Sequence, residues 1–120
     1  MDKLLEKSLL YDFYGELLTE HQRSVYESFV FEDMSLAEVA DEQGITRQGV
    51  HDLVKRCDKI LQGYEDKLHL VEKFVSIKKT VTEIEALTSS KRSASEDDAS
   101  DLRIRLDKIK ILTSDILEEL

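Results

Sequence analysis

The sequence lacks proline and tryptophan altogether, and it has only four glycines and one cysteine. Because proline interrupts helix interiors, a chain without it accommodates long helices. The single cysteine, Cys57, excludes an intramolecular disulfide and a cysteine-based zinc or iron–sulfur site. No hydrophobic run approaches the ~18 residues of a membrane span, and the charged N-terminal segment does not match a signal peptide. We therefore expect a soluble, cytoplasmic protein that does not contact the membrane.

Hydrophobic side chains recur at helical spacing along most of the chain, and no segment alternates with a period of two, as a strand would. Thr19 with Gln22, and Ser35 with Glu38, have the spacing of capping boxes, and Gly44 is typical of the residue that ends a helix. Helices are predicted over residues 2–18, 19–31, 36–43, from Thr46 onward, 64–87 and 100–120. The predicted fold class is all-α.

Gly63 is expected to break or kink the helix that begins after Thr46. This break divides the chain into two predicted domains, residues 1–62 and residues 63–120. The second domain would be a helical hairpin around a polar loop at residues 88–100, which holds no apolar residue larger than alanine.

The last predicted helix is apolar on two sides. Its heptad seam consists of Leu102, Leu106, Ile109, Ile116 and Leu120. A second apolar stripe consists of Ile104, Ile111, Leu112 and Leu117. A helix of this kind needs two packing partners, so a homodimer is expected. The alternative is that the last helix packs on the first two helices of its own chain.

Residues 36–55 have the spacing of a helix-turn-helix motif. Ala40 is small where the two helices approach, and Gly44 supplies the turn. The apolar anchors that hold the second helix are Val39, Ile45, Val50 and Leu53. The alternative interpretation is an ordinary pair of packed helices with a glycine turn.

A helix-turn-helix would direct seven polar residues of its second helix outward. These candidate nucleic-acid-binding residues are Arg47, Gln48, His51, Asp52, Lys55, Arg56 and Lys59. Arginine and glutamine at the start of such a helix suit guanine and adenine edges. The three later cations, Lys55, Arg56 and Lys59, are better placed for phosphates.

The net charge of the chain and the local charge of this helix point in opposite directions for nucleic-acid binding. The net charge of −9 taken alone argues against nucleic acid, because an acidic surface repels phosphates. Residues 46–60, however, hold four basic and two acidic residues. Two hypotheses follow: the chain is a nucleic-acid-binding regulator that uses this helix, or it is a protein–protein adaptor whose acidic body binds a basic partner.

No constellation of residues indicates an enzyme. The glycines are isolated, so there is no phosphate-binding loop, and no pair of carboxylates is placed in an apolar segment. His21, His51 and His69 are too far apart in sequence for a local histidine pair of the zinc-protease type. We therefore predict no catalytic residue, no metal site and no cofactor.

Residues 17–61 resemble region 4 of bacterial sigma factors. The matching segments are Leu18-Thr19-Glu20, Ser35-Leu36-Ala37-Glu38-Val39-Ala40, Gly44-Ile45-Thr46 and Val50. The chain is too short to hold the other regions of a sigma factor. The resemblance implies a sigma region 4-like helix-turn-helix bundle, here followed by the C-terminal helical hairpin.

Residues 5–75 are more closely similar to the YlxM family of small helix-turn-helix proteins from Gram-positive bacteria. The matching segments are Asp12-Phe13-Tyr14, Leu17-Leu18-Thr19, Tyr26, Phe29, Ser35 to Ala40, Arg47-Gln48-Gly49-Val50-His51-Asp52, Lys55-Arg56, Ile60-Leu61, Tyr64-Glu65 and Lys67-Leu68. This family is encoded beside the signal recognition particle protein Ffh. The resemblance therefore implies a role in the signal recognition particle pathway, with the particle's RNA, promoter DNA or a protein as the partner.

Overall fold

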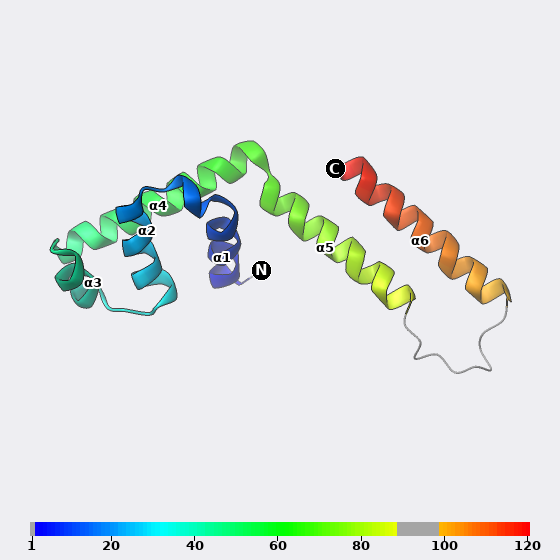
Figure 1. The fold of residues 1–120 in the computed structure, drawn as a ribbon, viewed down its shortest axis with the longest axis horizontal. Helices are drawn as coiled ribbons and strands as arrows, with labels where there is room; N and C mark the ends of the chain where they lie inside the picture. The colour runs from blue at the N-terminus through cyan, green and yellow to red at the C-terminus, as the bar shows by residue number, and fades with distance from the viewer. Residues whose placement is uncertain (1, 89–98) are drawn as a thin grey trace. The chain divides into compact units, whose positions relative to one another are not determined.

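The computed structural model describes residues 2–88 and 99–120, and within those ranges it contains helices and no β-strand (Figure 1). The predicted all-α class is confirmed. The described helices are α1 (Lys3–Tyr14), α2 (Glu20–Tyr26), α3 (Leu36–Gln43), α4 (Arg47–Leu68), α5 (Leu70–Leu87) and α6 (Ala99–Glu119), with a 3-10 segment at Gly15–Leu17 and a π-helical segment at Glu27–Phe31. None of the described helices combines the length and the hydropathy that crossing a membrane requires. The chain forms two compact units, residues 1–71 and residues 72–120.

Local capping contacts set the helix starts in the N-terminal unit. The Thr19 hydroxyl accepts from the Gln22 amide at 3.1 Å, and the Gln22 side chain accepts from the Thr19 amide at 2.9 Å. Ser35 and Glu38 make the same reciprocal pair, with both distances at 3.1 Å. Both predicted capping boxes are therefore confirmed, and each satisfies amides that the first turn of a helix leaves without partners.

The core of this unit lies where α1, α2 and α3 meet one side of α4 (Figure 1). Its largest fully buried side chains are Tyr14, Tyr26, Leu61, Val25, Val39, Val50 and Cys57. Asp58 of α4 ties the neighbouring helices together, because its carboxylate accepts from the Tyr26 hydroxyl at 2.6 Å and lies 3.6 Å from the Lys7 ammonium. The opposite side of α4 is left facing solvent.

The first predicted helix is too long at its C-terminal end. It ends at Tyr14, and the 3-10 segment Gly15–Leu17 follows it. This change of winding buries Tyr14 and leaves Leu17 56% exposed, so Leu17 does not continue the apolar stripe. The second predicted helix is confirmed as a continuous helical stretch, although α2 passes into the π-helical segment before it ends at Phe31.

The break expected at Gly63 is wrong in position. The helix α4 continues through Gly63 to Leu68, and His69 then adopts a left-handed conformation with φ of 56°. The next helix therefore begins at Leu70 rather than at residue 64. A glycine inside a helix costs only ~1 kcal/mol relative to alanine, which packing on both sides of the position readily offsets.

In the C-terminal unit, α5 and α6 lie side by side and antiparallel (Figure 1). The Ser76 hydroxyl donates to Oε2 of Glu119 at 3.0 Å, which fixes the level of one helix against the other. Neither helix contains a buried residue. Of the polar loop predicted at residues 88–100, residues 89–98 lie outside the described residues, and Ala99 and Ser100 belong to α6.

Candidate nucleic-acid interface

The turn between α3 and α4 positions the predicted interface. Gly44 adopts the left-handed conformation, with φ of 67°, and the Ile45 amide donates to the Ala40 carbonyl at 3.1 Å. Thr46 then caps α4, because its hydroxyl accepts from the Gly49 amide at 2.9 Å. This is the helix–turn–helix arrangement that the sequence predicted, with α4 as its second helix.

The seven predicted residues are all exposed, and they lie in the stretch of α4 from Arg47 to Lys59. At 1.5 Å per residue they extend along about 18 Å of the helix. The helical repeat places a line of four residues directly opposite the buried side; this line consists of Gln48, Asp52, Lys55 and Lys59. Arg47 and His51 fall to one flank of the line, and Arg56 falls to the other.

The charges within this line differ from one end to the other. Near the start of α4, the Gln48 side-chain amide donates to Oδ1 of Asp52 at 2.9 Å, and Nδ1 of His51 lies 3.7 Å from the same oxygen. Within the described part of the chain, Lys55 and Lys59 form no ion pair. The middle of α4 therefore presents two lysines that no ion pair among the described residues holds, with Asp52 as the nearest carboxylate on the same line.

Two hollows border the outer side of α4. One, of about 410 Å³, separates Arg56 and Asp52 from the beginning of α2 at Thr19 and His21. The other, of about 340 Å³, lies between α1 and α4 and has Lys3, Lys7 and Lys59 among its lining residues. Glu6 and Asp58 line the same hollow, and Lys7 pairs with Asp58. Lys3 of α1 is therefore the residue that extends the basic surface beyond α4, and the sequence of α4 alone did not predict it.

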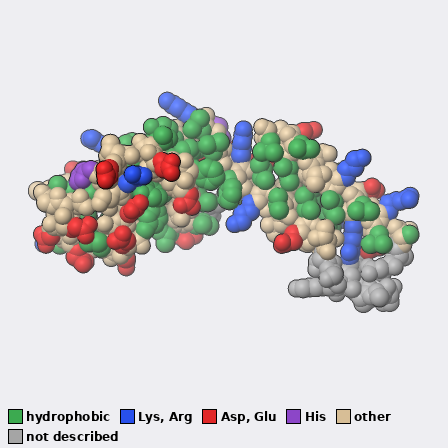
Figure 2. Space-filling model, viewed as in Figure 1, with side chains coloured by type: hydrophobic (Ala, Val, Ile, Leu, Met, Phe, Trp, Pro, Cys, Tyr) green, Lys and Arg blue, Asp and Glu red, His purple; other side chains and the backbone are tan. Residues whose placement is uncertain are grey.

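The segment that precedes α4 carries the opposite charge. Residues 24–46 contain no Lys, Arg or His, and they contain six carboxylates: Glu27, Glu32, Asp33, Glu38, Asp41 and Glu42. All six are exposed, and Figure 2 shows acidic side chains gathered at the end of the unit where α3 lies. The signal was available as a sequence count, because this stretch of 23 residues has charges of one sign only.

The titratable groups with raised pKa values lie in the core rather than on this surface. Burial raises the pKa of the Cys57 thiol to about 11. Burial also raises the pKa of the Tyr26 hydroxyl, and the hydrogen bond to Asp58 raises it further. Both groups therefore stay protonated near neutral pH, as expected for side chains that pack the core.

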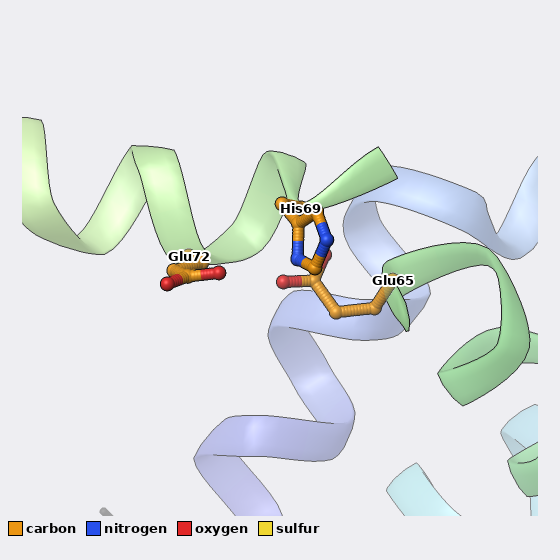
Figure 3. A group of neighbouring side chains, drawn as sticks. All are labelled: Glu65, His69 and Glu72. Carbon is orange, nitrogen blue, oxygen red and sulfur yellow. The ribbon is translucent and has the colours of Figure 1, made fainter. Parts of the chain in front are cut away.

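Three side chains that could ligate a metal, Glu65, His69 and Glu72, lie close together near the end of α4. The spacing of the histidines in the sequence did not predict this group. Figure 3 shows Glu65 and His69 at the end of α4 and Glu72 in the first turn of α5. Oε1 of Glu65 accepts hydrogen bonds from the Tyr14 hydroxyl at 2.6 Å and from the Val71 amide at 2.9 Å. The described contacts thus give Glu65 a structural role.

Comparison with known proteins identifies close relatives. The model of the UPF0122 family, described as "Putative helix-turn-helix protein, YlxM / p13 like", matches residues 1–101. A UPF0122 protein of Clostridium botulinum is 43% identical over 98 residues, which cover 82% of this chain and 90% of that protein. A UPF0122 protein of Desulforamulus reducens is 39% identical over 112 residues, covering 93% and 91% respectively. One from Bacillus thuringiensis is 37% identical over 97 residues, covering 81% and 88%.

Proposed function

The chain belongs to the UPF0122 family of YlxM/p13-like helix-turn-helix proteins, and from this premise we propose that it binds nucleic acid through the outer side of α4. The observation that carries the proposal is the pair Lys55 and Lys59, which are exposed on the line opposite the core and form no ion pair in the described part of the chain. Exposed lysines on one side of a helix are the side chains that commonly contact backbone phosphates.

The seven residues take different roles in this proposal. Lys55, Arg56 and Lys59 contact phosphates, which positions the ligand without reading its sequence. Arg47 and Gln48 are the candidate base readers, and Gln48 exchanges its hydrogen bond to Asp52 for one to a base edge. His51 and Asp52 border these contacts, and the carboxylate of Asp52 opposes phosphate approach.

The acidic segment at residues 24–46 constrains how the ligand docks. In the usual helix-turn-helix arrangement the first helix crosses the nucleic-acid backbone. The exposed carboxylates of α3, such as Glu38 and Asp41, disfavour that contact. We expect phosphates to approach the middle of α4 from the side of α1, where Lys3 lies beside Lys59.

Binding through so few cations should be weak and sensitive to salt. With three phosphate contacts, the affinity is expected to fall about 40-fold between 50 and 200 mM salt. The carboxylates of the remaining surface lower the affinity further at low ionic strength, where charges interact over a longer distance.

The resemblance to a family encoded beside Ffh makes the RNA of the signal recognition particle the first ligand to test. We propose that the chain acts in the cytoplasm as a regulator of that pathway, by binding rather than by catalysis. Duplex promoter DNA is the competing ligand, since region 4 of sigma factors, which residues 17–61 resemble, is a helix-turn-helix domain.

The test measures binding by fluorescence anisotropy with three labelled probes: the particle RNA, a DNA duplex and an unrelated structured RNA. Titrations at 50 and 200 mM salt give the affinity and its salt dependence. Lys55→Glu with Lys59→Glu should lower the affinity at least tenfold. The control, Lys73→Glu with Lys79→Glu on α5, makes the same change in net charge away from α4 and should lower it by less than threefold.

Equal losses in the two double variants would overturn the assignment to α4. Absence of binding to all three probes at 50 mM salt would overturn nucleic-acid binding itself. That result would favour the hypothesis of a protein–protein adaptor, because the six carboxylates of residues 24–46 form a negatively charged surface that a basic protein could bind. A pull-down after nuclease treatment then tests whether such a partner remains bound.

A further inference from the structure

The hairpin of α5 and α6 leaves large hydrophobic side chains in solvent. Leu106 is 65% exposed and Leu117 is 73% exposed on α6, and Phe74 is 40% exposed on α5. Figure 2 shows hydrophobic side chains gathered over this unit. Because neither helix contains a buried residue, the hairpin has no core of its own beyond the contact of one helix with the other.

These exposed side chains lie on one side of the hairpin. The helical repeat places Phe74 and Val81 on the same flank of α5, and it places Leu102, Leu106 and Leu117 on the same flank of α6. In an antiparallel pair these two flanks face the same way. We call this surface the leucine side; it consists of Phe74, Val81, Leu102, Leu106 and Leu117.

The opposite side of the hairpin has a different form. A hollow of about 420 Å³ lies there between the helices, and its lining residues include Ala86, Leu87, Ile111 and Leu112. Charged groups at its edge, Glu83 and Lys108, interrupt the apolar surface. The leucine side also has charged residues at its edges, with Lys78 over the Phe74 ring. It holds five exposed large hydrophobic side chains, whereas the opposite side holds Ile104 and Ile111, so it is the larger apolar surface of the two.

We propose that a second copy of this chain covers the leucine side, so that two hairpins form an antiparallel four-helix bundle. The size of the hairpin suits such a dimer. An 18-residue helix is about 27 Å long, and two helices packed 8–10 Å apart give a footprint of roughly 27 by 20 Å. The corrugated surface over such a footprint approaches the ~800 Å² per partner that ordinary dimers bury.

The charge of the hairpin also favours a second copy as its partner. The described part of the hairpin, residues 72–88 and 99–120, holds seven Lys and Arg residues against eight Asp and Glu residues. Such a balanced surface does not attract a strongly charged partner, nucleic acid and anionic lipid included. Two copies of it also do not repel one another, in contrast to the acidic N-terminal unit.

The outer edges of the leucine side are complementary to each other. The Ser76–Glu119 hydrogen bond sets the level of the two helices. Glu85 lies nine residues after Ser76 on α5, and Lys110 lies nine residues before Glu119 on α6. Because the helices are antiparallel, these two exposed side chains lie at the same height along the hairpin, Glu85 on the α5 edge and Lys110 on the α6 edge of the leucine side. A two-fold axis parallel to the helices lays α5 over the partner's α6, and each Glu85 then meets the partner's Lys110.

This bundle is independent of nucleic-acid binding, and the experiment uses the mass of the full chain. Light scattering at 10–100 µM should give twice the chain mass of 13.9 kDa. Leu106→Lys should give a single chain mass. Ile111→Lys is the matched control, because Ile111 is 62% exposed and lies on the opposite side, so its mass should stay doubled.

A single chain mass for the unchanged protein overturns the proposal, and so does dissociation by Ile111→Lys without dissociation by Leu106→Lys. Should both variants lose helical circular dichroism, a charge exchange decides. Glu85→Lys and Lys110→Glu, each alone, should weaken the dimer about fivefold, and the combined variant should restore it to within twofold. Failure of the combination to restore the dimer contradicts the two-fold arrangement.

Discussion

The hydroxyl of Tyr14 donates a hydrogen bond to Glu65 across 2.6 Å and so joins the end of α1 to the last turn of α4. The same hydroxyl accepts from the Leu70 amide at 3.2 Å, and the same Glu65 oxygen accepts from the Val71 amide at 2.9 Å. These two amides open α5, where a helix has no intrahelical partners for its N–H groups. The pair thus stabilises the start of α5 and the left-handed turn at His69.

We predict that Tyr14→Phe lowers the free energy of unfolding by about 1–3 kcal/mol, because it removes one hydrogen bond to the partly buried Glu65 carboxylate and takes the acceptor from the Leu70 amide. Urea denaturation followed by circular dichroism measures the loss. Tyr64→Phe is the control: its ring stacks on Tyr14 at 5.9 Å, but its hydroxyl makes no hydrogen bond in the described part of the chain. Equal losses in the two variants would contradict the role given to the Tyr14 hydroxyl.

Two glycines of the N-terminal unit should respond oppositely to alanine. Gly44 has φ of 67°, where a Cβ atom costs about 1–2 kcal/mol, so Gly44→Ala should lower the melting temperature. Gly63 lies inside α4 with open space where an alanine Cβ atom would stand, so Gly63→Ala should add about 1 kcal/mol. Thermal unfolding of both variants measures the difference, and a lower melting temperature for Gly63→Ala would contradict it.

The same two glycines show how far the sequence determines the fold. Gly44 was predictable because its turn depends on contacts within five residues, as do the capping boxes at Thr19 and Ser35. The end of α4 was not, because it depends on Tyr14 meeting Glu65, which is 51 residues away in sequence. The local sequence around α4 does not reveal a contact between residues so far apart. It therefore predicted the end of the helix at Gly63, a weak helix breaker, instead of at Leu68.

The exposure of the seven candidate residues was predictable for a related reason. An apolar line at Val50, Val54, Cys57 and Leu61 fixes which side of α4 is buried, and the helical repeat then directs the others outward. The pairing of Gln48 with Asp52 follows from the same i, i+4 spacing, yet residue types alone do not show which side chains already have partners. The position of Lys3 of α1 beside Lys59 required the tertiary fold.

The stability of the fold should fall at alkaline pH. Burial raises the pKa of Cys57 from 9.0 to about 11, so the folded state favours the protonated thiol. Its contribution is complete below about pH 9 and is lost as the pH rises toward 11, with a slope of at most about 1.4 kcal/mol per pH unit. Cys57→Ala should flatten the unfolding free energy between pH 9 and 10, as measured by urea denaturation. An unchanged slope in that interval would show that the thiol does not titrate there.

One carboxylate, that of Asp52, lies within the proposed interface. Asp52 accepts from Gln48 at 2.9 Å and lies on the same exposed line as Lys55 and Lys59. Asp52→Asn removes a charge that repels phosphate, so it should tighten nucleic-acid binding severalfold at 50 mM salt and less at 200 mM, where screening is stronger.

The chain offers a matched control for this change. Asp66 accepts from Gln62 at the same distance of 2.9 Å, on the same exposed side of α4 but nearer its C-terminal end. Asp66→Asn therefore alters net charge and a local glutamine pair in the same way, while it leaves the first half of α4 unchanged. The change in binding free energy caused by Asp66→Asn should be at most half of that caused by Asp52→Asn. If both variants tighten binding equally, the gain reflects the net charge of the protein, and α4 does not carry the contact.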